Sequence, residues 1–446
     1  MSEGTPNQED TPGRAWVVAA DMGYGHQRAV YPLRGIAEGG IMTVGRNDAA
    51  SRTERRLWSR MLMAYEGLSR AHGIPVIGKP IFSLLDSLLR IPSLYPMRNL
   101  SHRTLQVQLL TSLVDKGLCQ GMLERIGARK LPVVTSFFAP AIAVDSRTDH
   151  RIFCIICDAD LNRVWVAAQP WKSRIVYFAP CGKAARRLRA YGVPEDRILL
   201  TGFPLPDELV GGRDMTALRS MLGRRLRALD PASRFWPMHD RNLEHYLGPE
   251  NCKADPHHIL TITFAVGGAG AQKEIGARIV ASLRNRIKAG GLRLNLLAGT
   301  RPEVRDYFYA VKDAHAPGAP GLQVIFADTL DEYFTRFSET IKETDILWTK
   351  PSELSFYAAL GLPIIMTPAL GSQEKFNRRW LQEIGAGIRQ EDPDFADEWI
   401  FDKLRDGIFA GLAWSGFLRA RKLGLYRIQE VLRTGVLSPE SSPIMR

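Results

Sequence analysis

The chain has 446 residues, of which 45% are hydrophobic and 24% charged, and its formal net charge is +12. A chain of this length is longer than a domain with one hydrophobic core usually is, so we expect two domains. The positive charge favours an anionic partner. Basic residues are spread through helical segments without a nucleic-acid fold signature, so no nucleic-acid partner is expected, and nucleotide phosphates or anionic lipid headgroups rank higher.

The cysteine pattern points away from disulfides and metals. The five cysteines are too few for a disulfide framework in a chain of this size. Cys154 and Cys157 have metal-like spacing but lie in an apolar strand without a second pair, so we predict buried side chains, no metal and a reducing compartment. No apolar run reaches the roughly 20 residues that span a bilayer. We therefore expect a cytoplasmic protein, with at most peripheral contact with the inner face of the membrane.

The first predicted unit is a strand, a glycine turn and a helix. Residues 1–13 read as a disordered tail, and residues 15–20 form an apolar run of strand type. Gly23, Gly25 and His26 follow at once, which is typical of the first unit of a doubly wound sheet. The glycines allow a ligand to approach the backbone, and His26 lies at the helix start. A purely structural turn is the alternative.

A helical region over residues 51–130 comes next. Its apolar residues recur at helical spacing and are flanked by arginines: Leu57, Trp58, Met61, Leu62, Tyr65 and Leu68. Such a face either packs on the sheet or lies on an anionic membrane surface, and the pattern leaves both readings open.

Three more strands are predicted over residues 131–138, 151–157 and 175–180. Asp158 and Asp160 follow the second of them. Ligands of open parallel sheets bind at the carboxyl ends of strands, so both carboxylates are candidate acceptor contacts, although they could simply cap the following turn. Residues 207–257 are basic and loop-rich, and we expect a linker or insertion there.

The second half of the chain repeats the pattern of the first. A strand over residues 259–266 is followed by Gly267, Gly268 and Gly270. A glycine loop at a helix start suits a diphosphate, because backbone amides can reach its oxygens. The spacing is not that of a dinucleotide fingerprint. Further strands are expected over residues 292–298, which precede Thr300 and Arg301, and over residues 322–326.

Residues 345–377 read as strand, turn, short helix, second strand and a polar loop that opens another helix. Thr349 and Lys350 end the first strand, and Ser352 is placed to cap the helix amides and form an anion site. Glu353 lies at the same helix mouth, where a carboxylate can accept two sugar hydroxyls. An ordinary capped connection with a solvated Glu353 is the alternative. The polar loop supplies Gln373, Glu374 and Asn377.

These motifs together resemble one group of GT-B glycosyltransferases. The group contains the monogalactosyldiacylglycerol synthases, the processive diacylglycerol glucosyltransferases and the N-acetylglucosaminyltransferase of the peptidoglycan precursor. The resemblance rests on the Gly-x-Gly-His loop, on residues 192–204, and on the Thr-Lys-Pro, Gly-Leu-Pro and Gln-Glu-x-x-Asn elements between 349 and 377. The chain departs from the group where Ser352 and Glu353 replace a glycine pair.

The resemblance implies an α/β GT-B architecture, with two Rossmann-like domains facing across a cleft. Residues 14–206 would form the acceptor domain and residues 258–410 the nucleotide-sugar domain, with residues 411–446 forming a helix that returns to the first domain and a tail. It also implies the donor-binding residues, with Glu353 as the displaced ribose ligand: Gly267, Gly268, Gly270, Thr300, Arg301, Thr349, Lys350, Ser352, Glu353, Gln373, Glu374 and Asn377.

The implied activity is inverting, metal-independent transfer of a hexose from a UDP-sugar substrate, without a further cofactor, to a hydroxyl acceptor such as a lipid. His26, Asp21 or Asp158 would deprotonate the acceptor. Gly23, Gly25 and Asp160 would lie on the acceptor side. Two alternatives stay open, a UDP-N-acetylhexosamine 2-epimerase-like enzyme and a non-catalytic nucleotide-sugar-binding relative.

Overall fold

The computed structural model describes residues 13–45, 50–59, 91–253, 257–267, 270–440, 442, 444 and 446. Most of the predicted tail, the apolar stripe between 61 and 68, and Gly268 lie outside these residues. In the described part of the predicted helical region, residues 52–59 are helical and residues 91–104 are not.

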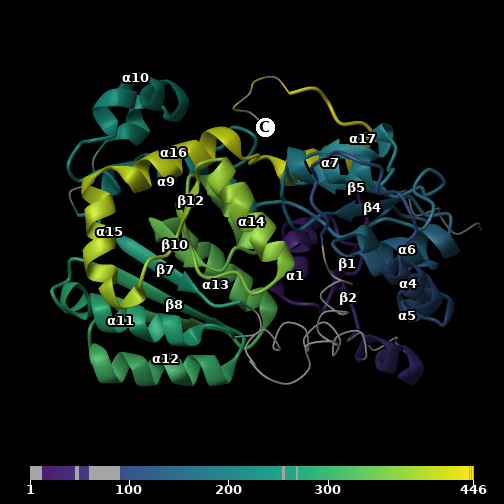
Figure 1. Ribbon diagram of the computed structural model, residues 1–446, viewed down its shortest axis with the longest axis horizontal. Helices are drawn as coiled ribbons and strands as arrows, with labels where there is room; N and C mark the ends of the chain where they lie inside the picture. Colours follow the sequence, from purple (N-terminus) through teal and green to yellow (C-terminus); the bar gives the residue numbers. More distant parts are fainter. Residues whose placement is uncertain are drawn as a thin grey trace, which may run out of the picture.

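Each half of the chain is built around a six-stranded parallel sheet (Figure 1). The strands of the first sheet are Trp16–Ala20 (β1), Met42–Val44 (β2), Val133–Thr135 (β3), Ile152–Ile155 (β4), Val176–Ala179 (β5) and Ile198–Leu200 (β6). Those of the second sheet are Thr261–Ala265 (β7), Arg293–Gly299 (β8), Leu322–Phe326 (β9), Ile346–Thr349 (β10), Ile364–Met366 (β11) and Gly387–Arg389 (β12).

Both sheets reverse their direction of winding next to their first strand. The first sheet has the order β2-β1-β3-β4-β5-β6 and the second the order β12-β11-β10-β7-β8-β9. In register, Val18 of β1 pairs with both Met42 and Thr135, and Thr263 of β7 pairs with both Asn295 and Leu347. Two parallel sheets wound in this way are two Rossmann-like domains. The predicted GT-B fold is therefore confirmed.

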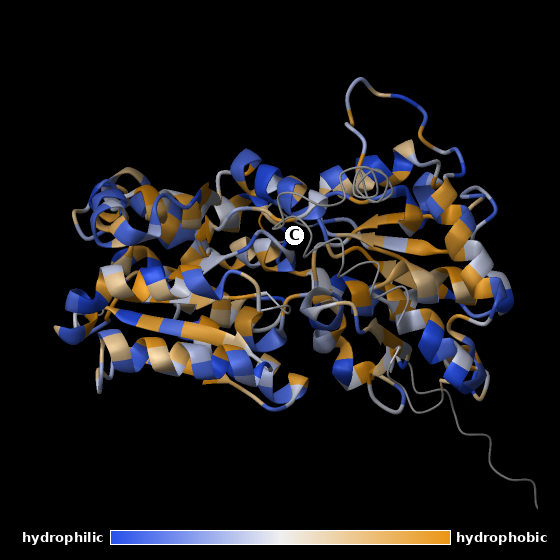
Figure 2. Ribbon diagram, turned by 60° about the horizontal axis from the view of Figure 1, so that its bottom comes forward, coloured by the Kyte–Doolittle hydropathy of each residue, from blue (hydrophilic) through white to orange (hydrophobic). Residues whose placement is uncertain are grey.

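Helices cover the sheets, and the buried strands β1, β7 and β10 are apolar enough for that position. Figure 2 shows hydrophobic strands inside and hydrophilic helix faces outside. The helices before β7 are Tyr24–Val30 (α1), Tyr31–Ile36 (η1), Leu105–Asp115 (α4), Gln120–Ile126 (α5), Phe138–Arg147 (α6), Arg163–Trp165 (η2), Gly182–Ala190 (α7), Glu195–Arg197 (η3), Asp207–Val210 (α8), Thr216–Ala228 (α9), Trp236–Leu247 (α10) and Pro249–Cys252 (η4). Those after β7 are Lys273–Lys288 (α11), Pro302–His315 (α12), Leu330–Glu343 (α13), Glu353–Leu360 (η5), Ser372–Glu383 (α14), Pro393–Phe395 (η6), Ala396–Arg405 (α15), Ile408–Arg419 (α16) and Gly424–Thr434 (α17). Across the described ranges, none of the helices combines the length and apolar character needed to cross a bilayer.

Residues 207–257 differ from the loop-rich link that the sequence suggested. They contain α8, α9, α10 and η4, and α9 packs against α16. Leu218, Leu222 and Leu226 recur at helical spacing on α9 and are fully buried. This segment is therefore part of the packing of the C-terminal domain.

The chain passes between the domains twice, and the two passages lie side by side. Gly202, in the first passage, has φ of +96°, and a Cβ on it would lie 2.7 Å from Cβ of Arg421 in the second. Beyond the second passage α17 lies on the N-terminal domain (Figure 1). There the Arg151 guanidinium lies close to Gly435, the residue that ends α17. The C-terminal helix thus returns to the first domain.

Arg225 fixes α9 to the C-terminal domain. Its buried guanidinium donates to the carbonyl oxygens of Thr344 at 2.9 Å, Leu360 at 2.8 Å and Gly361 at 3.2 Å. We predict that Arg225→Met lowers the free energy of unfolding by about 3 kcal/mol, because buried carbonyls lose their donors. The exposed Arg241→Met is the control in denaturant unfolding. Equal stability of the two variants would contradict the assignment of α9 to this domain.

Candidate functional site

The carboxyl ends of the central strands of the two sheets face each other. Contacts between them include the approach of the Tyr24 hydroxyl to Thr300 Oγ1 at 2.9 Å, the pair of Arg28 with Glu353, and the bond of Asn377 to the loop after β4. Both sheets change winding direction at this edge, and open parallel sheets bind ligands at such points. The domain interface is therefore the candidate functional site.

His26 lies on the N-terminal side of this interface, in the first turn of α1. Its Nδ1 is 2.8 Å from the carbonyl oxygen of Ser136, and the Ser136 hydroxyl donates to the His26 carbonyl. A carbonyl oxygen only accepts, so Nδ1 carries the proton and the lone pair is on Nε2. Burial lowers the pKa of His26, against the opposing effects of the Ser136 carbonyl and Glu353. At neutral pH the ring is a neutral base.

Aromatic side chains surround the His26 ring. Phe137 packs edge-on with ring centroids 4.8 Å apart, and Trp165 lies 6.0 Å away. Phe138 in turn lies 4.0 Å from Phe137 and 5.5 Å from Trp165. This apolar wall explains the desolvation of the imidazole.

Asn377 bridges the two domains with its whole carboxamide. Its Nδ2 donates to Asp158 Oδ1 at 2.7 Å and to the Pro351 carbonyl at 3.1 Å, while its Oδ1 accepts from the Ala159 amide at 2.7 Å. The side chain is fully buried. Asn377, which the resemblance assigns to the donor sugar, is thus engaged by the N-terminal domain in this arrangement.

Of the three aspartates that the sequence offered, Asp158 is the one that bonds across this interface. Burial raises its pKa to about 6; the Asn377 hydrogen bond opposes that rise, and Glu353 and Glu374 add to it. The two other acidic candidates are placed differently. Asp160 is buried in an ion pair with Arg187, 2.7 Å apart, within the N-terminal domain, and Asp21 accepts from Gln27.

On the C-terminal side, Lys350 lies against Gly267, the first residue of the glycine loop. A Cβ on Gly267 would be only 2.4 Å from Lys350 Cε, so a side chain at this position would push the lysine aside. The Lys350 ammonium pairs with Glu374 at 2.9 Å, and Glu374 also accepts from the Leu370 amide at 2.7 Å. Gly270 adopts φ of +68° at the end of the loop. A lysine beside a glycine loop suits the charge of a diphosphate.

The predicted phosphate-binding role of the Ser352 turn is not supported by its geometry. Ser352 makes no capping hydrogen bond, and its amide donates to the Lys350 carbonyl at 2.8 Å. The following helix η5 is of the 3₁₀ type, whose first amides are not arranged as in an α-helix. Thr349 is also occupied, since its hydroxyl donates to the Ala265 carbonyl between β10 and β7.

The remaining candidate residues from the sequence differ in their contacts and in their exposure. The Thr300 amide donates to the Tyr24 hydroxyl at 2.9 Å, so Thr300 joins the domains. Arg301 pairs with Glu303 at the start of α12. Gln373 is partly buried in the first turn of α14. Gly23, with φ of +105°, is the exposed residue before α1.

Arg28 is an interface residue that the motif analysis missed. Its guanidinium lies 4.0 Å from the Phe337 ring and 4.9 Å from the Phe334 ring, and its Nε donates to Glu353 Oε1 at 3.2 Å. The side chains of Arg28 and Glu353 are 4% and 10% exposed. The one available signal was an arginine directly before the apolar run from Ala29 onward. Glu353 is therefore not the solvated residue of the alternative reading.

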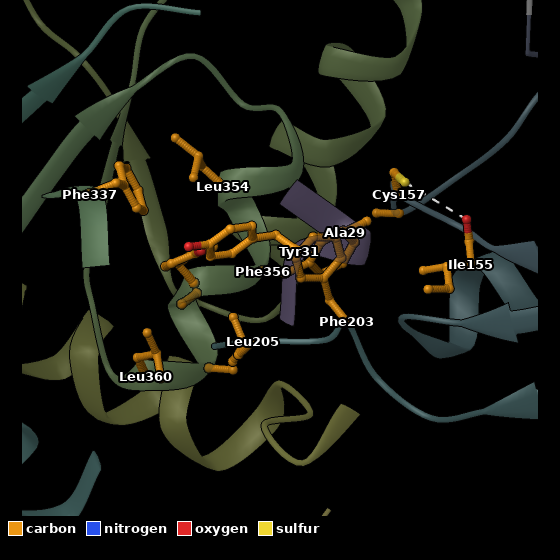
Figure 3. Packing of buried hydrophobic residues seen from close by; sticks show 14 of the residues in the cluster. Ala29, Tyr31, Ile155, Cys157, Phe203, Leu205, Phe337, Leu354, Phe356 and Leu360 are labelled. Atoms are coloured by element: carbon orange, nitrogen blue, oxygen red, sulfur yellow. Dashed lines mark hydrogen bonds between the residues drawn. The ribbon is translucent and has the colours of Figure 1, made fainter. Parts of the chain in front are cut away.

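Apolar packing surrounds these polar contacts. Figure 3 shows Ala29, Tyr31 and Phe203 of the N-terminal domain close to Phe356 of the C-terminal domain. Phe203 and Phe356 stack with ring centroids 5.2 Å apart. The cysteines Cys154 and Cys157 are free and buried, as expected.

Comparison with known proteins gives likenesses of fold. No protein-family model and no curated protein matches the chain. The Staphylococcus aureus MnaA–UDP structure is 12% identical with a TM-score of 0.48, covering 94% of this chain and 96% of its own. A putative UDP-N-acetylglucosamine 2-epimerase from Listeria monocytogenes has 11% identity and a TM-score of 0.49, covering 96% and 97%. A glycosyltransferase from Rickettsia africae has 12% identity and a TM-score of 0.41, covering 95% and 98%. At these values we draw no conclusion about function from them.

Asp158 generates a pH-dependent prediction. Because its pKa in the folded protein is about 6, above the ordinary 3.8, the folded state holds this proton more tightly than the unfolded chain. Its contribution to stability is present at low pH and is lost as pH rises to about 6. Asp158→Asn should therefore gain roughly 1–3 kcal/mol over the wild type at pH 8, and much less at pH 4.5, in denaturant unfolding.

Asp160→Asn is the matched control for this measurement. It leaves the buried Arg187 without its counter-charge and should lose about 3 kcal/mol at pH 8. An Asp158→Asn gain that does not vary between pH 4.5 and pH 8 would show that this carboxyl has an ordinary pKa.

Proposed function

We propose that the chain is an inverting glycosyltransferase that moves a hexose from a UDP-sugar to a hydroxyl acceptor. The observation that carries this proposal is the placement of a neutral base, His26, at the domain interface. Its Nδ1 is committed to the Ser136 carbonyl, which leaves Nε2 to accept a proton. The opposite side of the interface presents Lys350 and the glycine loop.

The reaction follows as a single displacement. His26 Nε2 takes the proton of the acceptor hydroxyl while that oxygen attacks the anomeric carbon. The bond between this carbon and the diphosphate oxygen breaks, and its electron pair stays on the leaving diphosphate. Lys350 and the amides of the glycine loop supply the countercharge that a metal supplies in other glycosyltransferases. One displacement inverts the anomeric configuration.

A nucleotide-sugar 2-epimerase is the second candidate, because Asp158 offers another carboxyl that exchanges protons near neutral pH. Incubation of a UDP-N-acetylhexosamine in D₂O without acceptor separates the two. Conversion of the sugar with deuterium at C2 would identify an epimerase.

A thermal-shift screen with UDP, GDP and their sugars tests the donor itself, because a bound ligand raises the melting temperature. Binding without turnover across acceptors would indicate a non-catalytic relative.

We extend the proposal to a lipid acceptor on an anionic membrane surface. Leu105 and Leu109 lie one turn apart on α4 and are 55% and 52% exposed, and Met97 precedes them at 73%. Helix α4 packs against α6 and η2, which carry Phe138 and Trp165 of the wall beside His26. Arg98 and Arg103 in the same stretch add positive charge. Apolar side chains among basic ones suit an anionic interface.

His26→Ala tests the proposed base. Turnover should fall by about 10²–10⁴-fold, the usual contribution of general base catalysis. The affinity for UDP should stay unchanged, because Lys350 and the glycine loop are intact. Exposed His245→Ala serves as the control, with sugar transfer and UDP calorimetry as measurements. Wild-type turnover in His26→Ala would remove this residue from the mechanism.

Sedimentation with liposomes tests the membrane surface. The wild type should sediment with anionic vesicles at low salt and less so as salt rises, since surface charges are screened. The double variant Leu105→Ser and Leu109→Ser should bind more weakly, whereas Met238→Ser, an exposed residue of α10, should bind like the wild type. A protein that stays in the supernatant at low salt would favour a water-soluble acceptor.

A further inference from the structure

The Glu353 carboxylate reaches from the C-terminal domain to the first helix of the N-terminal domain. A Cβ on Gly25 would lie 2.9 Å from Glu353 Oε2, so a larger residue at 25 would displace this carboxylate. Gly25 directly precedes His26. The negative charge of Glu353 is therefore held beside the start of α1, next to the proposed base.

Arg28 fixes the carboxylate in this position. Its Nε donates to Glu353 Oε1, while its guanidinium stacks on the Phe337 ring. A buried guanidinium without a counter-charge is strongly unfavourable, so the two side chains require each other. Because Arg28 and Glu353 belong to different domains, the pair exists only while the domains are closed.

Glu353 is the charged group that acts on His26, because the other titratable groups near Glu353 are neutral or already bonded to a partner. Burial raises the pKa of Tyr333 and of Tyr357 to about 12, and that of Cys157 well above its usual value, so all three are neutral. Asp158 is held by Asn377, and Arg28 is the cation of the pair itself. Among these groups, Glu353 is the one whose charge raises the pKa of His26.

We propose that Arg28 and Glu353 are positioning residues for the glycosyl transfer: domain closure brings the Glu353 carboxylate beside His26, where it stabilises the imidazolium formed in the reaction. This inference rests on the proposed function. The acceptor proton moves to His26 Nε2, the other ring proton stays on Nδ1 in its hydrogen bond to the Ser136 carbonyl, and the new positive charge lies on the residue next to Gly25, which Glu353 approaches. An open protein lacks this charge and has a weaker base, so the chemistry is coupled to closure.

Glu353→Gln is the decisive variant, because the amide oxygen still accepts from Arg28 and only the charge is lost. The His26 titration midpoint, followed by NMR with labelled histidine and assigned with His26→Asn, should fall by at least about half a pH unit. The acid limb of kcat/KM should move in the same direction, and kcat should fall about tenfold. Kd for UDP should stay within about twofold.

Two further variants complete the experiment. Glu353→Asp keeps the carboxylate and should recover at least part of the midpoint. Lys183→Met removes a different cross-domain ion pair, with Glu383 at 3.7 Å, and should leave the His26 midpoint unchanged. Melting temperatures of all variants report whether the fold is kept.

An unchanged His26 midpoint in Glu353→Gln would overturn the inference. An unchanged midpoint together with a large loss of UDP affinity would instead assign Glu353 to the nucleotide. Absence of sugar transfer by the wild type would refute the proposed function, whereas the NMR comparison would still decide whether Glu353 acts on His26.

Discussion

The buried guanidinium of Arg28 at the domain interface constrains the side chains that surround it. Arg28 is almost completely enclosed, so it requires both a carboxylate and polarisable ring faces. Glu353 supplies the carboxylate and Phe334 and Phe337 supply the faces, all from the opposite domain. The absence of a side chain at Gly25 gives Glu353 room. One charge thus determines the identity of residues far apart in the chain.

Buried polar groups need partners, and for this reason several residues of the predicted donor motif are engaged within the protein. The Asn377 carboxamide makes hydrogen bonds with Asp158, Ala159 and Pro351, so its polar atoms hold the domains together. Glu353 is likewise engaged by Arg28. Lys350 and Glu374, which pair beside Gly267, stay partly accessible on the C-terminal side. The Lys350 ammonium therefore lies beside Gly267 with Glu374 as its counter-ion.

The sequence predicted the fold well, because its signals were local. Apolar runs of strand type followed by glycine turns marked β1 and β7, and the polar residues after them fell at one edge of each sheet. Helix α9 was missed, although Leu218, Leu222 and Leu226 have helical spacing, because the surrounding arginines and prolines suggested loops.

The candidate site was predictable only in part. His26 could be found because it adjoins a glycine turn, and Lys350 because it belongs to the Thr-Lys-Pro element that ends a predicted strand. The partnership of Arg28 with Glu353 could not, since the residues are 325 positions apart and neither carries a motif for the other. The predicted cap at Ser352 is absent although its backbone is extended as at other N-caps, because capping also requires the side chain to reach a following amide, which the residue type does not determine.

The paired passages of the chain between the domains also limit how the domains can move. Gly202 and Arg421 are in contact, and Gly424 is packed against the Phe203 carbonyl, so both covalent connections run through one narrow region. Two tethers side by side oppose sliding and separation but permit rotation about a line through them. Opening would then be a hinge rotation about the two connections, and the edges farthest from Gly202 would move the most.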